Sequence, residues 1–154
     1  MRFNEEYKKG LNGENIVIDW FITGKWQVND LRNIPYWRRK DIDIQVIKDN
    51  RAFYFEIKSQ KRIATHNQIV IEMLDLEHNK EGWFYYSEAD YFIFVNPIEE
   101  IGYIISAFAL KEYIDTHNFT EELNGYSNCI VLYLNLDEMK GIFQKVILKG
   151  GKDE

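Results

Sequence analysis

The chain has 154 residues, a net charge of −6 and many aromatic residues, with ten Tyr, ten Phe and four Trp. This length predicts a single domain over residues 1–154 with a substantial core, and the charge argues against a generic nucleic-acid coat protein. The lone Cys129 excludes an internal disulfide framework, no apolar stretch could span a bilayer, and the polar amino terminus shows no secretory signal, so we expect a cytoplasmic protein without a membrane segment.

The predicted elements begin with a helix from Asn4 to Ile22, because Tyr7, Leu11, Ile18 and Phe21 fall on one stripe and Gly24 follows. The next elements are a short strand near Trp26–Val28, a loop through Pro35, and two strands at Ile42–Lys48 and Ala52–Lys58. The segment Gln68–Leu74 favours a strand over a helix. After a turn at Asn79–Gly82 come strands at Tyr91–Asn96 and Tyr103–Phe108, a helix over Leu110–Thr116, a strand at Cys129–Leu134 and a short helix near Asp137–Gln144. This order favours an α/β or α+β domain with a central mixed sheet flanked by helices.

The two strands Ile42–Lys48 and Ala52–Lys58 read as a hairpin. Asp49 and Asn50 form a strong two-residue turn signal, because both residue types tolerate positive φ. Folding about this turn pairs residues whose numbers sum to 99. One face is then apolar, and the other face opposes Gln45 with Tyr54, Asp43 with Glu56, and Asp41 with Lys58. Opposed side chains lie roughly 4.5–5.5 Å apart at Cβ, so the carboxylates of Asp43 and Glu56 should repel each other.

A divalent cation would offset that repulsion. Asp43, Glu56 and the backbone carbonyl of Ile57 supply the hard oxygen ligands that Mg²⁺ prefers, and Mn²⁺ would substitute for it. Lys58 lies on the same face as Glu56 and could orient or deprotonate an attacking water. Beside a cation we expect its pKa to be lowered. Asp41 lies opposite Lys58, where a salt bridge would satisfy it, so it is assigned a supporting role.

Glu14 falls on the apolar stripe of the first helix, where a carboxylate is costly unless it is paired or bound to metal. Packed against the hairpin, it could reach Asp43 and Glu56 and hold a second ion. The alternative is a helix that frays at Gly13 and leaves Glu14 at the rim.

Charge is distributed unevenly along the chain. From Arg32 to Arg62 there are nine basic and four acidic residues, whereas Glu72 to Glu100 holds eight acidic residues and one lysine. A basic surface around one site can bind phosphates, although these side chains could equally be a solvated approach to a strand. The residues expected to contact nucleic acid are Arg38, Arg39, Lys40, Lys61, Arg62 and His66. Trp37 could stack on a base or pack as a rim aromatic, and Glu72 is either an extra acid or an exposed strand residue.

The pattern of Glu14, Asp43 and Glu56-x-Lys58 resembles the PD-(D/E)XK nuclease superfamily, with its restriction-endonuclease-like fold. The resemblance covers about Leu11 to Lys58. It implies that Glu14 is the helix acid, that Asp43 and Glu56 are metal ligands and that Lys58 is the catalytic lysine. Ile42 stands where the pattern has proline, and Gln68 would be the polar residue after the motif only if its segment were helical.

The resemblance implies a Mg²⁺-dependent nuclease, foremost an endodeoxyribonuclease, with branched, phage or repair DNA among the substrates and RNA left open. Cutting both strands requires two active sites, which makes a homodimer an expectation. The alternative is a catalytically silent accessory module on the same scaffold that binds protein or nucleic acid. The acidic body and the aromatic residues favour that alternative, whereas the intact set Glu14, Asp43, Glu56 and Lys58 disfavours it.

Overall fold

The computed structural model describes residues 2–149, with side chains from residue 13 onward. The helices are α1 (Arg2–Thr23), α2 (Pro35–Arg38), α3 (Arg62–His66), α4 (Trp83–Tyr86) and α5 (Ala107–Thr116), with a 3₁₀ turn at Leu136–Met139. The strands are β1 (Gln27–Asp30), β2 (Ile44–Lys48), β3 (Arg51–Ser59), β4 (Gln68–Asp75), β5 (Lys80–Glu81), β6 (Tyr91–Asn96), β7 (Ile101–Ser106), β8 (Glu122–Asn124), β9 (Cys129–Asn135) and β10 (Gln144–Ile147).

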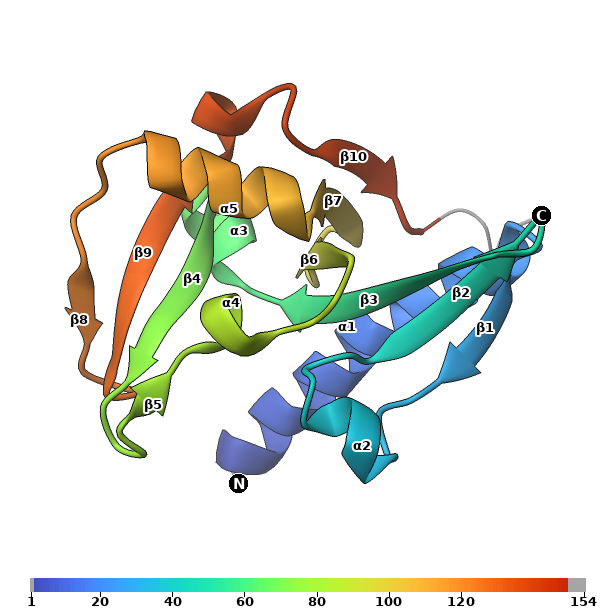
Figure 1. Cartoon of the computed structure of the whole chain (residues 1–154), viewed down its shortest axis with the longest axis horizontal. Coiled ribbons are helices and arrows are strands. Elements are labelled where there is room, and N and C mark those ends of the chain that lie inside the picture. Colours follow the sequence, from blue (N-terminus) through green and yellow to red (C-terminus); the bar gives the residue numbers. More distant parts are fainter. Residues whose placement is uncertain (1, 150–154) are drawn as a thin grey trace.

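The strands form two sheets (Figure 1). The larger sheet has the order β1-β2-β3-β6-β7-β10, and it is mixed because β3 and β6 run parallel while every other pair is antiparallel. The smaller sheet has the order β5-β4-β9-β8 and is antiparallel throughout. The structure therefore confirms an α+β fold with a central mixed sheet.

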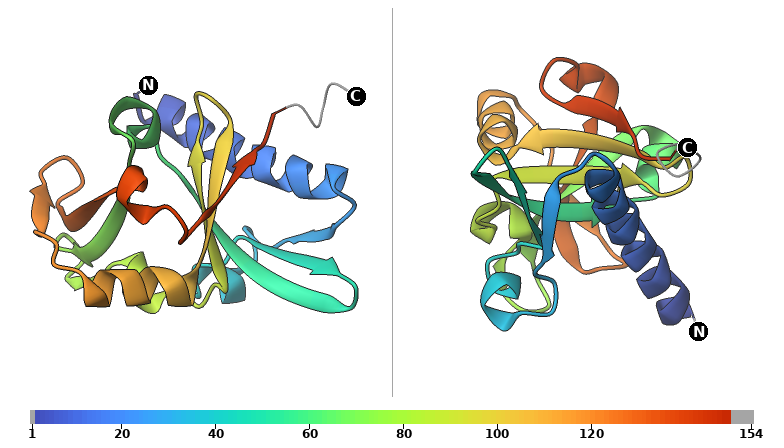
Figure 2. Two further views of the ribbon diagram at one scale, coloured as in Figure 1. Left: turned by 90° about the horizontal axis from the view of Figure 1, so that it is seen from above. Right: turned by 90° about the vertical axis from the view of Figure 1, so that its right-hand side faces the viewer.

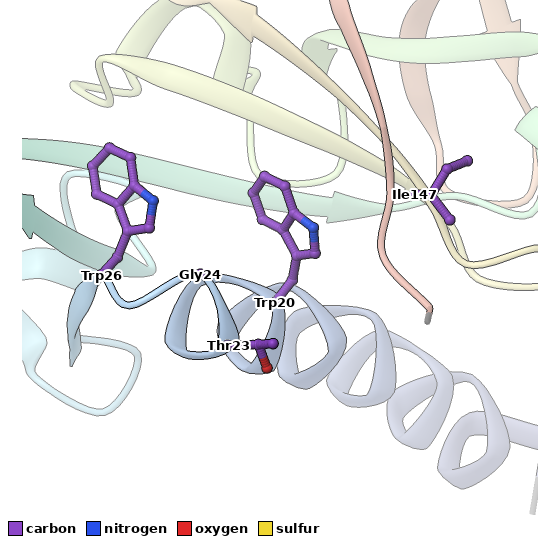
Figure 3. Close-up of a pocket in the computed structure, with 5 residues that line it drawn as sticks. All are labelled: Trp20, Thr23, Gly24, Trp26 and Ile147. Carbon is purple, nitrogen blue, oxygen red and sulfur yellow. The ribbon is translucent and has the colours of Figure 1, made fainter. Parts of the chain in front are cut away.

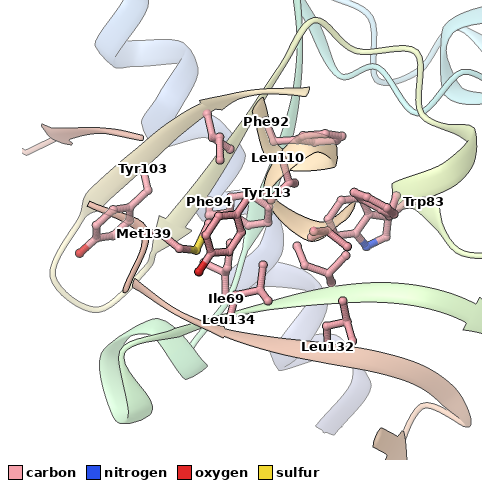
Figure 4. Packing of buried hydrophobic residues seen from close by; sticks show 14 of the residues in the cluster. Ile69, Trp83, Phe92, Phe94, Tyr103, Leu110, Tyr113, Leu132, Leu134 and Met139 are labelled. Atoms are coloured by element: carbon pink, nitrogen blue, oxygen red, sulfur yellow. The ribbon is translucent and has the colours of Figure 1, made fainter. Parts of the chain in front are cut away.

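The two faces of the six-stranded sheet have separate apolar cores. On one face, Val17 and Phe21 of α1 pack on Ile44, Val46 and Phe55 of the hairpin. On the other face, side chains of β6 and β7 meet those of α4, α5 and the smaller sheet, among them Phe92, Phe94, Leu110, Leu132 and Leu134 (Figure 4). Seen from above, α1 and the four-stranded sheet lie on opposite sides of β6 and β7 (Figure 2).

The expected hairpin forms with the expected register. Ile44 pairs with Phe55 and Val46 with Phe53, and Asp49 and Asn50 have φ values of 53° and 62°. These left-handed values fit a two-residue hairpin turn. The hairpin's first strand begins at Ile44 rather than Ile42, because the N–H of Ile57 donates to the side chain of Asp43 and not to a backbone carbonyl. The expected pairs of Ile42 with Ile57, Asp43 with Glu56 and Asp41 with Lys58 are therefore absent from the β-ladder.

Most other elements agree with expectation, and the differences have local causes. The first helix, the strand at β4 and the strands β6, β7 and β9 are confirmed. The first helix ends at Thr23, and Lys25, not Gly24, has the left-handed backbone that follows it. The loop expected through Pro35 contains the short helix α2, which has proline at its first position, where a missing N–H is tolerated. The short helix expected near Asp137–Gln144 is a 3₁₀ turn over Leu136–Met139, and Gln144 begins strand β10. No helix within residues 2–149 is long and apolar enough to cross a membrane.

Candidate active site

A cleft of about 670 Å³ opens between α1, the segment before β2, and β3. It brings together side chains that are far apart in the sequence, including the three acids expected at the site. The cleft is lined by Glu14, Asn15, Arg32, Asn33, Arg38, Asp41, Ile42, Asp43 and Glu56. Acidic and basic groups therefore share one concave surface at the open end of the hairpin.

Asp43 occupies the point where β2 separates from β3. Its backbone N–H donates to the carbonyl of Phe55 at 2.9 Å, and its Oδ2 accepts from the N–H of Ile57 at 2.8 Å. The side chain thus replaces the backbone acceptor that a continuing strand would have supplied. Because the N–H and C=O of one strand residue point to the same edge, the carbonyl of Ile57 also points toward Asp43.

Glu56 and Lys58 form an ion pair that is largely withdrawn from water. Nζ of Lys58 lies 2.9 Å from Oε2 of Glu56, and the two side chains are 18% and 6% exposed. Burial raises the pKa of Glu56 well above its usual value, the charge of Lys58 opposes that shift, and the charge of Asp43 adds to it. The Glu56 carboxylate is therefore held in a position that disfavours its charged form.

Lys58 is enclosed by acids and one aromatic ring. Its Nζ lies 3.4 Å from Oδ2 of Asp41 and 4.6 Å from the ring centroid of Trp83 on α4. Burial lowers the pKa of Lys58, but the charges of Glu56 and Asp41 outweigh burial, so the pKa is raised above its ordinary value. The lowering expected for this pKa applies to Lys58 beside a bound cation and stays a prediction.

Asp41 lies opposite Lys58, and the two side chains form the expected salt bridge. Its Oδ2 is buried, has no hydrogen-bond partner among the described residues, and lies 3.4 Å from Nζ of Lys58. The left-handed backbone of Asp41 turns the chain from α2 into β2, and its carbonyl accepts from the hydroxyl of Ser87 at 3.1 Å.

Glu14 reaches the cleft from α1 and meets a cation that the sequence did not single out. Its Oε2 accepts from Nη1 of Arg32 at 3.0 Å. Arg32 is in turn held by Asp30, with Nε–Oδ1 and Nη2–Oδ2 distances of 2.9 and 2.7 Å. Burial and the nearby charge of Asp43 raise the pKa of Glu14, and Arg32 opposes that shift. Glu14 is thus not at a frayed helix end.

The basic residues expected to contact nucleic acid divide into two groups. Arg38 lines the cleft and Arg39 follows it, whereas Lys40 pairs with Glu88 at 3.6 Å. Lys61, Arg62 and His66 lie on or beside α3, outside the lining of the cleft. Arg62 donates to Gln68 at 2.8 Å and stacks on Tyr133 at 4.0 Å.

The supporting residues Gln68 and Glu72 both lie on β4, in the smaller sheet, outside the lining of the cleft. The segment is a strand, so Gln68 is not on a helix after the motif. Gln60 follows the motif after Ser59 and exchanges two hydrogen bonds with the backbone of Val70, at 2.9 and 2.8 Å. Trp37 stacks on Tyr54 with centroids 5.1 Å apart, so it packs as a rim aromatic.

The donor set suits a hard cation such as Mg²⁺. Asp43 and Glu56 contribute neighbouring carboxylates, and the carbonyl of Ile57 points toward Asp43. Burial, and then the charge of Asp43, raise the pKa of Glu56, and Oδ2 of Asp41 is buried without a hydrogen-bond partner among the described residues. Among the described residues, no three His, Cys, Asp or Glu side chains are already arranged as metal ligands. Mg²⁺ commonly uses one or two carboxylates and retains several waters.

Sequence reasoning missed Arg32, Asp30 and Trp83. The charge count had included Arg32, but its contacts with α1 depend on how the helix packs against the loop. Trp83 on α4 reaches Lys58 on β3 from a segment that is distant in the sequence, so the contact depends on the tertiary fold. A separate apolar hollow of about 210 Å³ lies beside the end of α1, where the indoles of Trp20 and Trp26 point the same way and Ile147 of β10 faces them (Figure 3).

Comparison with known proteins gives a fold-level likeness. No protein-family model matches the chain, and no curated protein matches it significantly. Among solved structures, the bacterial homing endonuclease I-Ssp6803I is similar, at 12% identity over 82% of this chain and 72% of that chain, with a TM-score of 0.49. At this distance the likeness assigns no activity to this chain, and the side chains of the cleft have to support any assignment.

Proposed function

We propose that the protein is a Mg²⁺-dependent nuclease of the PD-(D/E)XK type that hydrolyses phosphodiester bonds in DNA. One observation carries the proposal. Glu14, Asp43 and Glu56, from a helix and from both sides of a hairpin, line a single cleft, and Lys58 lies 2.9 Å from Glu56. Carboxylates brought this close repel one another, and a bound cation would remove that cost.

In the proposed nuclease each residue of the site would have its own role. Asp43, Glu56 and the Ile57 carbonyl would hold the ion, and Glu14 would serve a second ion or a bound water. When bound, Mg²⁺ supplies a Lewis acid for the phosphate and lowers the pKa of a water. Lys58, protonated in this arrangement, would orient the attacking water through a hydrogen bond and stabilise charge on the phosphate oxygens. Arg38 on the cleft wall, with Arg39 beside it, would bind flanking phosphates.

A cleavage assay tests the proposal. Supercoiled, linear, single-stranded and four-way-junction DNA are incubated with the protein in Mg²⁺ and in EDTA, beside the Lys58→Ala and Asp43→Asn variants. We expect cleavage in Mg²⁺ only, lost in both variants, while Lys145→Ala on the distant strand β10 retains it. Cleavage of both strands at one position would further require two copies of the chain, which sedimentation of the DNA complex measures. Cleavage that survives in EDTA or in Asp43→Asn contradicts the proposal.

One observation favours the silent accessory module instead. Every acid of the cleft already meets a cation or an N–H donor: Glu14 meets Arg32, Glu56 and Asp41 meet Lys58, and Asp43 accepts from Ile57. In such a module these ion pairs and this hydrogen bond would satisfy the acids, and the cleft would bind no metal ion. Thermal melting with Mn²⁺ discriminates, because an ion that binds only the folded protein raises its stability by RT ln(1 + [L]/Kd). A silent module would show no shift.

A further inference from the structure

A second groove, of about 590 Å³, adjoins the catalytic cleft. Two segments that are distant in the sequence form its walls: the end of α2, and the stretch from β5 to α4. The groove is lined by Arg38, Arg39, Lys80, Glu81 and Tyr86. In Figure 1, α2 and α4 lie on the same side of the hairpin, with β5 leading into α4.

The lining combines positive charge with an exposed aromatic ring. Three cations face one carboxylate, Glu81, so the groove carries a net positive charge. Tyr86 is 40% exposed, and Nζ of Lys80 lies 5.9 Å from the centroid of its ring. Positive groups beside an open aromatic ring form the combination that binds a nucleic-acid strand through its phosphates and one base.

Two features connect this groove to the catalytic cleft. Arg38 lines both. Tyr86 is also within electrostatic reach of the acids, because burial and then the charge of Asp41 raise the pKa of its phenol. A strand whose phosphate lies at Asp43 and Glu56 can therefore continue past Arg38 to Tyr86 without leaving the surface.

We propose that this second groove binds an unpaired nucleotide of the substrate strand, next to the phosphodiester bond that is cut, with phosphates at Arg39 and Lys80 and the base stacked on Tyr86. In a continuous duplex the bases are stacked on one another and cannot reach an aromatic side chain on the protein, so a stacking ring selects an unpaired base. The inference rests on the proposed function and narrows its substrate to DNA with a single-stranded segment, such as a branch, gap or end.

Binding in EDTA tests this separately from cleavage. Fluorescence anisotropy compares a blunt duplex with the same duplex carrying a short single-stranded extension. We expect the wild type to prefer the extended DNA and Tyr86→Leu to lose about tenfold in affinity for it, with little change for the blunt duplex. Tyr86→Phe keeps the ring and should bind normally. Lys80→Ala and Arg39→Ala should each lower the slope of log affinity against log salt by about 0.7–0.9, whereas Lys145→Ala on β10 should not.

The outcomes separate the two proposals. If the wild type cleaves DNA but Tyr86→Leu binds DNA as the wild type does, the proposal for the second groove is wrong and the proposed nuclease activity stands. If the affinities for blunt and extended DNA are equal, and the variants lower both to the same extent, the groove does not select an unpaired nucleotide and that inference is wrong. Preference for extended DNA that depends on Tyr86, without any cleavage in Mg²⁺, supports the groove and overturns the nuclease. Melting curves of each variant establish that it is folded, and the exposed position of Tyr86 makes this the expected result.

Discussion

Replacement of Asp43 by Asn should make the protein without metal more stable, which is unusual for a change at an active site. The charge of Asp43 raises the pKa of Glu56, so the two carboxylates lie close enough to repel each other. Two unit charges about 5 Å apart repel by roughly 1–3 kcal/mol for an effective dielectric constant between that of water and about 20. The amide oxygen of Asn can still accept from the N–H of Ile57, and exchanging the charged acceptor for a neutral one costs about 1 kcal/mol. The net gain is about 1 kcal/mol, or roughly 3 °C in Tm for a chain of this size.

The measurement is thermal melting in EDTA at pH 8 and pH 5, and again with Mn²⁺. The gain should be larger at pH 8, because Glu56 is protonated at low pH and no longer repels Asp43. With Mn²⁺ the wild type should gain stability and Asp43→Asn should not. Glu77→Gln, an exposed acid in the turn after β4, is the matched control and should change neither value. A less stable Asp43→Asn protein at pH 8, or one that keeps the full Mn²⁺ response, would refute the reasoning.

The other predictions concern the same site and its surroundings. Lys58→Met should destabilise the protein without metal by about 3 kcal/mol in urea, because Glu56 is left buried without its cation; a neutral result would contradict the buried pair. Since the pKa of Glu56 is raised in the folded state, the contribution of Glu56 to stability in EDTA should be greatest at low pH and fall by up to about 1.4 kcal/mol per pH unit as pH rises from about 4.5 through the folded pKa. The difference in stability between the wild type and Glu56→Gln, measured against pH, should show this slope. Gly82→Ala should cost about 2 kcal/mol or more because its Cβ would collide with the carbonyl of Glu72, whereas Gly125→Ala has open space and serves as the control.

Local signals account for what the sequence predicted well. The hairpin register follows from two turn residues and the alternation of Ile44, Val46, Phe53 and Phe55, all within twelve residues of one another. Elements whose stability comes from distant partners were missed. Strand β10 exists because it pairs with β7, and β8 because it pairs with β9. Their own residues carry no strong strand pattern.

The candidate site shows the same contrast between local sequence signals and contacts with distant segments. Strand alternation places Glu56 and Lys58 on one face of β3, where they form an ion pair. Asp43 and Glu56 both line the cleft, although they do not pair in the hairpin ladder as expected. Arg32 could not be assigned, since its contacts depend on how α1 crosses the loop before β2. The folded chain surrounds the ammonium of Lys58 with Asp41 and Glu56, and their charges raise its pKa. The lowering expected beside a bound cation stays a prediction.

The hydrogen bond between Asp43 and Ile57 has a consequence for recognising active and inactive relatives of this chain. A side-chain oxygen at position 43 accepts the N–H of Ile57 in β3 whether or not the protein catalyses a reaction. Natural selection for folding alone would therefore preserve Asp or Asn there. Glu56 is buried against its own charge, and its ion pair with Lys58 is the contact that offsets this cost. Under the proposed function, a relative that keeps Glu56 and Lys58 together is therefore more informative about a working site than one that keeps Asp43 alone.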